Sequence, residues 1–462
     1  MRHTLTLLLI IGSLFSVNGQ MKKWTLEECV TYAVDNNLTI EQFELDLENA
    51  KIDKSDAIGG FLPDFNANSN ISERSGLVVD PNSNSNVSGT IFSVSPSLSS
   101  NITLFDGLRN VKRLQRAKLN TIANQYRLDD LKDDIRLNVA NAYLQVLSSK
   151  EQLKVFKAQY AVTEQDLKRT KELVESGVSP RGDLLEIEAT AANQEQQIVN
   201  GESLVLISRV NLAQLLQITD YENFDIADES FAVPPSDILN NSAKVIFDKA
   251  LGFRNDIKFS EATVDLAKKD LEIAKGANYP TLGAFFRYNT FYSNQFQVVR
   301  DPQTGQPIIN PNTMLPEFFR EEFIDQLWLN DGISYGFQLN VPIFNGWSTK
   351  NGVKRSKISL ERAELQFEQD KLALEATVQQ AYVDVGTFEK AYEAASKTLE
   401  ARRLAYDYAK ERFDVGLMNS FDFSQAQARV DNAEADLIRT KYDYIFRLKI
   451  LEFYFGLPIS LN

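Results

Sequence analysis

Two kinds of hydrophobic periodicity follow each other along the chain, and the whole order occurs twice. After Thr25, apolar residues recur at intervals of three and four, and the residues Thr-Leu-Glu-Glu at 25–28 have the pattern of a capping box. Between residues 92 and 104 the interval falls to two, with apolar side chains opposed by Ser, Asn and Thr. Residues 333–344 repeat this alternation, which predicts two β-strands with one apolar face each.

A weaker alternating segment precedes each of these strands, at residues 63–72 and 280–292. The loops between the paired segments are rich in Asn, Ser, Pro and Gly: residues 73–89 and 293–332. We therefore predict two β-hairpins, over residues 61–105 and 279–344.

A helical pattern without a stop signal runs from Leu108 to Glu175, and at ~1.5 Å per residue this helix would be on the order of 100 Å long. Its apolar residues form a coiled-coil-like seam: Leu131, Ile135, Val139, Ala142, Val146, Leu153, Phe156, Tyr160 and Leu167. The second half has the same seam: Leu374, Val378, Ala381, Val385, Tyr392, Ala395, Leu399 and Tyr406. Each half therefore predicts one very long helix.

The two halves of the chain are copies of one unit. A shift of 239 positions takes Gly107 to Gly346 and continues without a gap through the long helix. Upstream, a shift of 217 positions takes Pro63 to Pro280. The difference of 22 residues places an insertion in the second hairpin.

This duplication predicts the domain organisation. The first repeat covers residues 20–240 and contains a helix, a hairpin, a long helix, a return helix and a linker. The second repeat covers residues 241–462 and has the same order. Residues 1–19, with a basic start and an apolar run over 5–17, have the pattern of a signal peptide.

Each long helix ends at a break that contains glycine. Gly permits the positive φ that a sharp helix end often needs, so we predict that Gly177 and Gly416 each turn a helix back antiparallel to itself. The residues Asp183-Leu-Leu-Glu186 then have the pattern of a capping box for the first return helix. Asp422 takes the corresponding position in the second return helix.

Composition excludes several classes of function. The one His, His3, lies in the signal peptide, so histidine catalysis and histidine metal sites are excluded. A net charge of −14 argues against a nucleic-acid partner. The acidic pairs at 129–130 and 133–134 are expected on a solvated helix face, and Cys29 on an apolar helix face rather than at a lipid anchor. We therefore predict no enzyme activity, no metal and no cofactor.

The alternating strands are long enough to cross a membrane, because a tilted transmembrane strand needs ~9–11 residues. Their apolar and Ser/Asn/Gln-rich faces suit an outer-membrane barrel with a wet lumen. Four strands cannot close such a barrel, and open edges are not tolerated in lipid. Three chains that share one barrel would give twelve strands.

The order of helix, hairpin, long helix, break and return helix, duplicated, with Asp106-Gly107 and Asn345-Gly346 after the second strands, resembles the TolC-like outer membrane efflux proteins. The resemblance covers nearly all of the mature chain. It implies a mainly α fold with β: a homotrimer with four strands per chain in a twelve-stranded transmembrane barrel, and coiled-coil-like helices that form a periplasmic tunnel. It also implies outer-membrane lipid, a periplasmic adaptor protein and an inner-membrane pump as partners.

The resemblance also indicates candidate sites. The tips at the two breaks would dock the adaptor: Gly177, Val178, Val415, Gly416 and Leu417. Asp422, with Asp183 as its counterpart, would lie near the periplasmic mouth and favour cations there. The family has a second acid three residues later, where this chain has Gln425. The alternative is that both aspartates only cap their helices.

We therefore expect the outer-membrane exit channel of a tripartite efflux system that passes drugs or metabolites to the exterior. Two alternatives stay open, the outer-membrane conduit of a type I protein secretion system and an exported structural coiled-coil protein. Residues 316–328, in the inserted loop 293–332, have the pattern of a short amphipathic helix. It would serve as a cap over the outer mouth or as a partner surface, or the loop would simply fold on its own rim.

Overall fold

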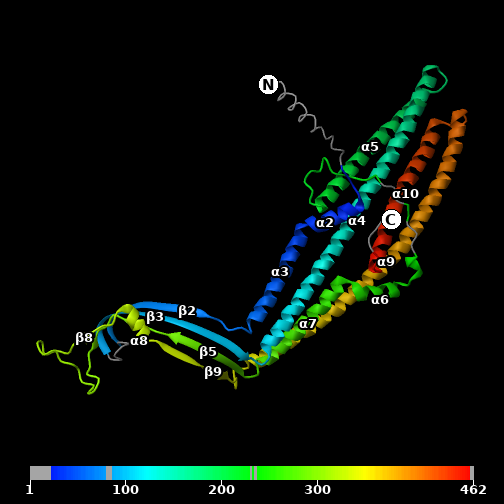
Figure 1. Cartoon of the computed structure of the whole chain (residues 1–462). Helices are drawn as coiled ribbons and strands as arrows, with labels where there is room; N and C mark the ends of the chain where they lie inside the picture. The colour runs from blue at the N-terminus through cyan, green and yellow to red at the C-terminus, as the bar shows by residue number, and fades with distance from the viewer. Residues whose placement is uncertain (1–21, 80–85, 229–231, 234–236, 458–462) are drawn as a thin grey trace, which may run out of the picture. The chain divides into compact units, whose positions relative to one another are not determined.

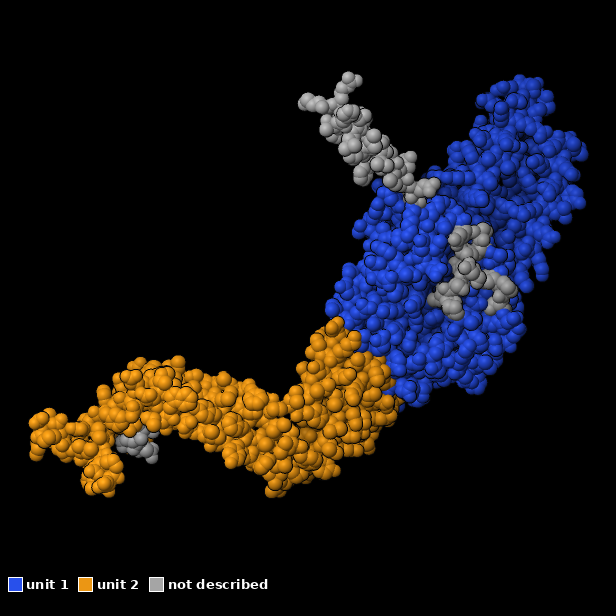
Figure 2. Space-filling model, viewed as in Figure 1, with its two compact units in different colours: residues 1–47, 123–261, 365–462 blue, residues 48–122, 262–364 orange. Residues whose placement is uncertain are grey.

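The computed structural model describes residues 22–79, 86–228, 232–233 and 237–457. The predicted signal peptide lies outside these residues. The chain separates into two compact units, each built from both halves of the sequence (Figure 2). Unit 1 comprises Met1–Leu47, Ala123–Glu261 and Leu365–Asn462, and unit 2 comprises Glu48–Ile122 and Ala262–Glu364.

The helices that are common to both repeats occur in pairs of equal length (Figure 1). The pairs are α2 (Leu26–Asn36) with α6 (Ala243–Phe253), α3 (Leu38–Gly59) with α7 (Asn255–Gly276), α4 (Arg109–Glu175) with α9 (Ser348–Asp414), and α5 (Arg181–Leu215) with α10 (Ser420–Tyr454). Both members of the third pair have 67 residues, and their first residues, Arg109 and Ser348, are 239 positions apart. The predicted long helices are thus confirmed. Within the described residues, no helix combines the length and the apolar character that a membrane crossing requires.

In unit 2, four strands form one antiparallel sheet in the order β2-β3-β5-β9 (Figure 1). They are β2 (Asn66–Val79), β3 (Asn86–Phe105), β5 (Thr281–Asn289) and β9 (Gly332–Asn340), and the short β6 (Tyr292–Ser293) also pairs with β3. Both predicted hairpins are therefore confirmed. The pairing of β3 with β5 joins them into one sheet.

The register places the predicted apolar side chains on one face. Phe286 is paired with Tyr335, and Tyr288 is paired with both Ile333 and Leu98. Because side chains opposite each other in an antiparallel pair lie on the same face, the apolar positions of β3, β5 and β9 form one continuous surface.

The strand ends differ from the prediction. β2 and β3 continue into the loop that was predicted over residues 73–89. Pairs of hydroxyl side chains link the two strands there, such as Ser75 Oγ with Thr90 Oγ1 at 3.0 Å. β9 ends at Asn340, shortly before Pro342, which has no N–H group for a ladder hydrogen bond. The predicted end at residue 344 was wrong for this reason.

The second hairpin loop has secondary structure of its own. It contains β7 (Gln297–Val298) paired with β8 (Phe318–Phe319), followed by helix α8 (Phe323–Leu329). The helix predicted over residues 316–328 is therefore shorter than expected, because its first part is used by β8.

The two largest hydrophobic clusters of unit 1 use equivalent positions of the two repeats. Val139 and Val146 are fully buried in the first core, and Val378 and Val385, 239 positions later, are fully buried in the second. Cys29 is completely buried in the first core, where burial raises the pKa of its thiol to about 12. Its interpretation as an apolar core residue is confirmed.

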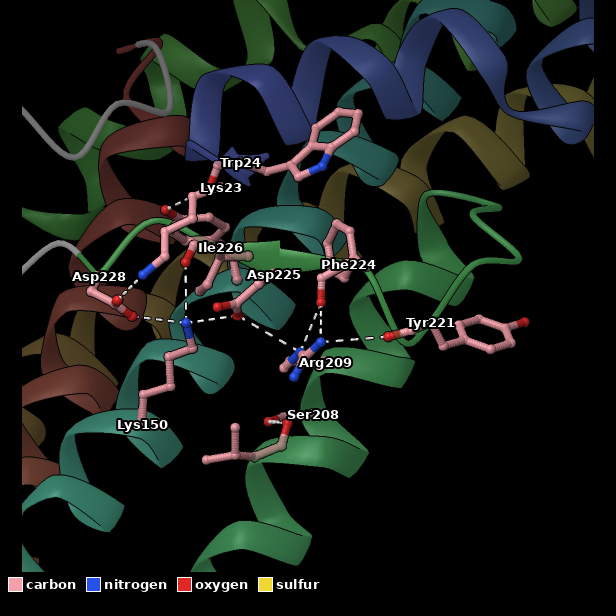
Figure 3. A network of polar contacts seen from close by, with 12 residues as sticks. Lys23, Trp24, Lys150, Ser208, Arg209, Tyr221, Phe224, Asp225, Ile226 and Asp228 are labelled. Atoms are coloured by element: carbon pink, nitrogen blue, oxygen red, sulfur yellow. Dashed lines mark hydrogen bonds and ion pairs between the residues drawn. The ribbon is translucent and has the colours of Figure 1, made fainter. Parts of the chain in front are cut away.

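A polar network holds the start of α2 against the segment that follows α5 (Figure 3). β1 (Lys23–Trp24) pairs in parallel with β4 (Asp225–Ile226). Lys150 Nζ lies 2.7 Å from Asp225 and 2.8 Å from Asp228, and Arg209 Nε donates to the Phe224 carbonyl at 2.9 Å. The hydrogen bond from Lys150 lowers the pKa of Asp228. These contacts hold residues 224–228, which belong to the predicted linker between the repeats.

Candidate functional site: the two helical tips

Both helix breaks are glycine turns of one type. Gly177 has a φ of +76° and Gly416 a φ of +75°, so the predicted positive φ is confirmed at both positions. Val178 N–H donates to the Leu173 carbonyl at 2.8 Å, and Gly177 N–H donates to the Val174 carbonyl at 3.0 Å. These two bonds define a Schellman motif, in which the residue after the helix must be left-handed.

The second tip repeats this geometry. Leu417 N–H donates to the Arg412 carbonyl at 2.8 Å, and Gly416 N–H donates to the Phe413 carbonyl at 3.0 Å. The two turns lie at the same end of unit 1 (Figure 1). Each connects two helices of one repeat, α4 with α5 and α9 with α10.

Apolar side chains at these turns are exposed. The exposed fractions are 71% for Val178, 69% for Val415 and 71% for Leu417. These side chains give each tip a small apolar surface. Because apolar surface is unfavourable in water, a partner protein could cover it.

The capping box predicted at Asp183 was wrong. Helix α5 begins at Arg181, its N-cap is Pro180, and no side chain makes the capping hydrogen bond. Asp183 lies in the first turn, where its Oδ1 accepts a 2.6 Å hydrogen bond from Ser420 Oγ of the other tip. Its carboxylate therefore links the two repeats.

Asp422 does not occupy the N-cap position either. The N-cap of α10 is Asn419, whose Oδ1 accepts from Asp422 N–H at 2.8 Å, while Asn419 Nδ2 donates to the Asp422 carboxylate at 3.0 Å. Asp422 thus supports the cap, and its side chain is exposed. Gln425 is exposed as well, and its Oε1 accepts from Arg429 at 3.2 Å.

A row of polar contacts continues from the Asp183–Ser420 link along α4, α5 and α10. Its members are Thr190 with Ser424 at 3.3 Å, Gln194 with Asp431 at 3.0 Å, Thr163 with Gln427 at 2.8 Å, and Gln159 with Glu434 at 3.1 Å. Burial raises the pKa of Asp431 to about 6. Sequence reasoning missed this row, although polar residues at core-facing helical spacing were a signal for it.

The acidic pairs at 129–130 and 133–134 do not lie on a simple solvated face. Asp130 is partly buried beside the buried Arg254, which lies 3.4 Å from Asp130 and 3.1 Å from Asp256. Burial, together with the neighbouring Asp256, raises the pKa of Asp130 to about 6. Within the described residues, no group of three or more Asp, Glu, Cys or His side chains is suited to a metal ion.

The sheet carries the second candidate surface, its apolar face. On β9, the exposed fractions are 62% for Ile333, 81% for Tyr335, 74% for Phe337 and 65% for Leu339. A contiguous apolar face of this size on a β-sheet is typical of contact with lipid. Together with the glycine-turned helical hairpins, it defines the architecture of an outer-membrane channel with a helical tunnel.

Comparisons with known proteins agree with this class. A family model described as outer membrane efflux protein matches residues 31–216 and 246–456, so the chain belongs to this family. Outer membrane protein TolC of Vibrio cholerae is 25% identical over 320 residues, which cover 67% of this chain and 64% of TolC. Alkaline protease secretion protein AprF of Pseudomonas aeruginosa is 21% identical over 345 residues, which cover 74% of this chain and 66% of AprF. The chain thus spans just under two thirds of these relatives.

Solved structures show the same fold. The CmeC outer membrane channel of Campylobacter jejuni has a TM-score of 0.75 at 18% identity, over 93% of this chain and 85% of CmeC. The outer membrane protein VceC of Vibrio cholerae has a TM-score of 0.74 at 15% identity, over 94% of this chain and 97% of VceC. The chain therefore has the TolC-like channel-tunnel fold, and its family is one of outer membrane proteins. Its family is one of channels, not of enzymes.

Proposed function

We propose that three copies of this chain form the outer-membrane exit channel of a tripartite efflux system. The channel passes small molecules, such as drugs or metabolites, from an inner-membrane pump and a periplasmic adaptor to the exterior. One observation carries the proposal: the same chain has an apolar β-face suited to lipid and two exposed apolar helical tips suited to a protein partner. Its family supports the efflux role.

The trimer follows from the sheet edges. In the single chain, β2 and β9 are the outer strands of the four-stranded sheet. Unpaired strand edges are not tolerated in lipid, and pairing β9 of one copy with β2 of the next closes twelve strands into a barrel.

The tips are the proposed adaptor-docking sites. Val178, Val415 and Leu417 provide the apolar contact area, and Gly177 and Gly416 hold the backbone in the shape that presents them. The Asp183–Ser420 hydrogen bond keeps the two tips together, so an adaptor would meet both as one surface.

We assign to Asp422 the negative charge that would favour cations near the periplasmic mouth. Its carboxylate is exposed while its backbone N–H is bound by the N-cap Asn419, so the capping contact and a solvent-facing charge are compatible. Gln425 adds no second charge, and Asp183 is engaged by Ser420.

A second candidate function is the outer-membrane conduit of a type I protein secretion system. It is favoured by the similarity to an alkaline protease secretion protein. Deletion of the gene separates the two functions. Accumulation of small dyes in the deletion strain supports efflux, whereas retention of a secreted protein with unchanged dye accumulation supports secretion.

Docking is tested with single cysteines and a thiol-to-amine crosslinker in cells. Leu417→Cys or Val178→Cys should form a crosslink to the adaptor, whereas Val199→Cys, which is 64% exposed on α5 but lies away from the turns, should not. The one natural cysteine, Cys29, is buried and leaves the background low. Crosslinks from Val199→Cys, with none from the two tip variants, would show that the adaptor docks away from the tips.

A further inference from the structure

Helix α8 of the inserted loop is fastened to the sheet by buried polar contacts. Gln326 is 3% exposed, and its amide bonds both the N–H and the carbonyl of Ser293, each at 3.0 Å. Thr290 Oγ1 donates to the Leu327 carbonyl at 2.7 Å, and Asn330 Nδ2 donates to the Phe291 carbonyl at 2.9 Å. The helix therefore has a fixed position at the β5–β9 end that is away from α7 and α9.

The polarity of α8 is the reverse of that of a helix packed on a soluble core. Its polar residue Gln326 faces the sheet, while Ile324 and Trp328 are 58% and 72% exposed. At 3.6 residues per turn, residues two positions before and after Gln326 both project from the opposite side of the helix. An apolar pair thus points outward from a rigidly held helix.

An aromatic series connects α8 to the apolar face of the sheet. The Phe323 ring lies 4.9 Å from the Tyr292 ring, which lies 6.4 Å from the Phe92 ring. Tyr292 is paired with Val94, two residues from Phe92, so both aromatic side chains lie on the face that carries Val94. The proposed lipid-facing surface therefore continues onto α8.

Tryptophans flank β9 at both ends. Trp328 precedes the strand and Trp347 follows it, with exposed fractions of 72% and 57%. Nine strand residues at ~3.3 Å per residue span the apolar band of an outer-membrane barrel, which is ~25 Å tall. Trp favours the two interfaces that border such a band.

We propose that α8 is an interfacial anchor that inserts Ile324 and Trp328 into the outer leaflet of the outer membrane. The occupant of this surface is lipid, because the surface is continuous with the lipid-facing side of the barrel and not with the lumen side. Glu321 and Glu322 precede α8 and Asp325 lies in its first turn, while Arg320 donates to the Asn294 carbonyl. Attachment therefore relies on apolar burial and not on attraction to anionic headgroups. This inference rests on the proposed trimeric barrel, and it does not depend on which molecule the channel exports.

The test uses tryptophan fluorescence of the full-length mature chain in phosphatidylcholine vesicles with brominated acyl chains, which quench indoles in contact with them. The chain has three Trp, at 24, 328 and 347. Trp24→Phe with Trp347→Phe leaves Trp328 as the reporter, and Trp24→Phe with Trp328→Phe leaves Trp347. Trp328→Phe with Trp347→Phe leaves Trp24, which lies in unit 1, as the unquenched reference.

We expect brominated lipid to quench Trp328 to an extent similar to Trp347, with Trp24 unchanged. Quenching of Trp347 without quenching of Trp328 overturns the anchor and leaves the barrel intact. Absence of quenching at both positions overturns the barrel as well. Disulfide formation between copies of Ile324→Cys would also overturn the anchor, because it would place α8 against a neighbouring copy over the mouth.

Discussion

Ser420 Oγ donates a 2.6 Å hydrogen bond to Asp183 Oδ1, and this bond joins the first turns of the two return helices. The donor is 4% exposed. The two residues are 237 positions apart and belong to different repeats. Each tip of the chain is therefore held by the other and not only by its own hairpin.

Ser420→Ala should loosen the two tips without unfolding either helix. Asn419 remains as the N-cap of α10, and one lost hydrogen bond costs about 0.5–1.5 kcal/mol. We expect faster amide hydrogen exchange around residues 176–183 and unchanged exchange in the sheet. Ser176→Ala is the matched control, since the Ser176 hydroxyl bonds only within its own tip, to the Leu173 carbonyl. Equal effects of both variants would mean that the link between repeats contributes nothing.

Asp431→Asn should stabilise the protein at neutral pH. Burial raises the pKa of Asp431 to about 6, whereas an unfolded aspartate has a pKa of about 3.9. Between these values the folded state binds a proton that the unfolded state has released, so this group lowers stability as the pH rises from about 4 to about 6, and stability stays lowered above.

The asparagine variant keeps an acceptor for Gln194 Nε2 but carries no charge. Its Tm should therefore exceed that of the wild type at about pH 8 and approach it at about pH 4. The exposed Asp436→Asn serves as control and should show no such pH-dependent gain. A gain that is constant with pH would exclude a buried charge as the cause.

Much of the architecture could be predicted because it depends on local pattern. The helical pattern without a stop signal predicted the length of α4, and the same pattern in the second repeat predicted that of α9. The alternation of Ile333, Tyr335 and Phe337 predicted the apolar face. The positive φ of Gly177 and Gly416 followed from the helix breaks alone. Each of these features is determined by residues that are near in sequence.

What could not be predicted depends on contacts between distant residues. Asp183 has a capping pattern in sequence, but Pro180 starts α5 earlier and Ser420 of the other repeat binds its carboxylate. Gln326 lies in the segment predicted as an amphipathic helix, and its burial accompanies hydrogen bonds to the backbone of Ser293, 33 positions away.

A charge should impair assembly when it is placed on one face of β9 and have little effect on the other face. Phe337→Lys places a charge on the lipid face close to the middle of β9, at a cost of roughly 2–4 kcal/mol per chain near the bilayer midplane. Gln338→Lys, the neighbouring residue on the other face, should assemble almost normally. The readout is the amount of heat-resistant trimer in outer-membrane fractions. Similar losses for both variants would show that the face assignment is wrong.

Asp422→Asn should reduce the cation preference of the channel and leave its stability close to wild type. The amide oxygen can still accept from Asn419 Nδ2, so the start of α10 is retained while the charge is removed. Reversal potentials in asymmetric salt, with thermal unfolding in parallel, measure both properties. An unchanged reversal potential would leave Asp422 with a role in the helix cap alone.

The central claim is that several chains share one barrel, because in the described part of the chain β2 and β9 have no strand on their outer sides. Native mass spectrometry of the protein extracted from outer membranes in mild detergent tests this most directly. We predict a single species that contains three chains. A folded, stable species that contains one chain would contradict the shared barrel and the exit channel built on it.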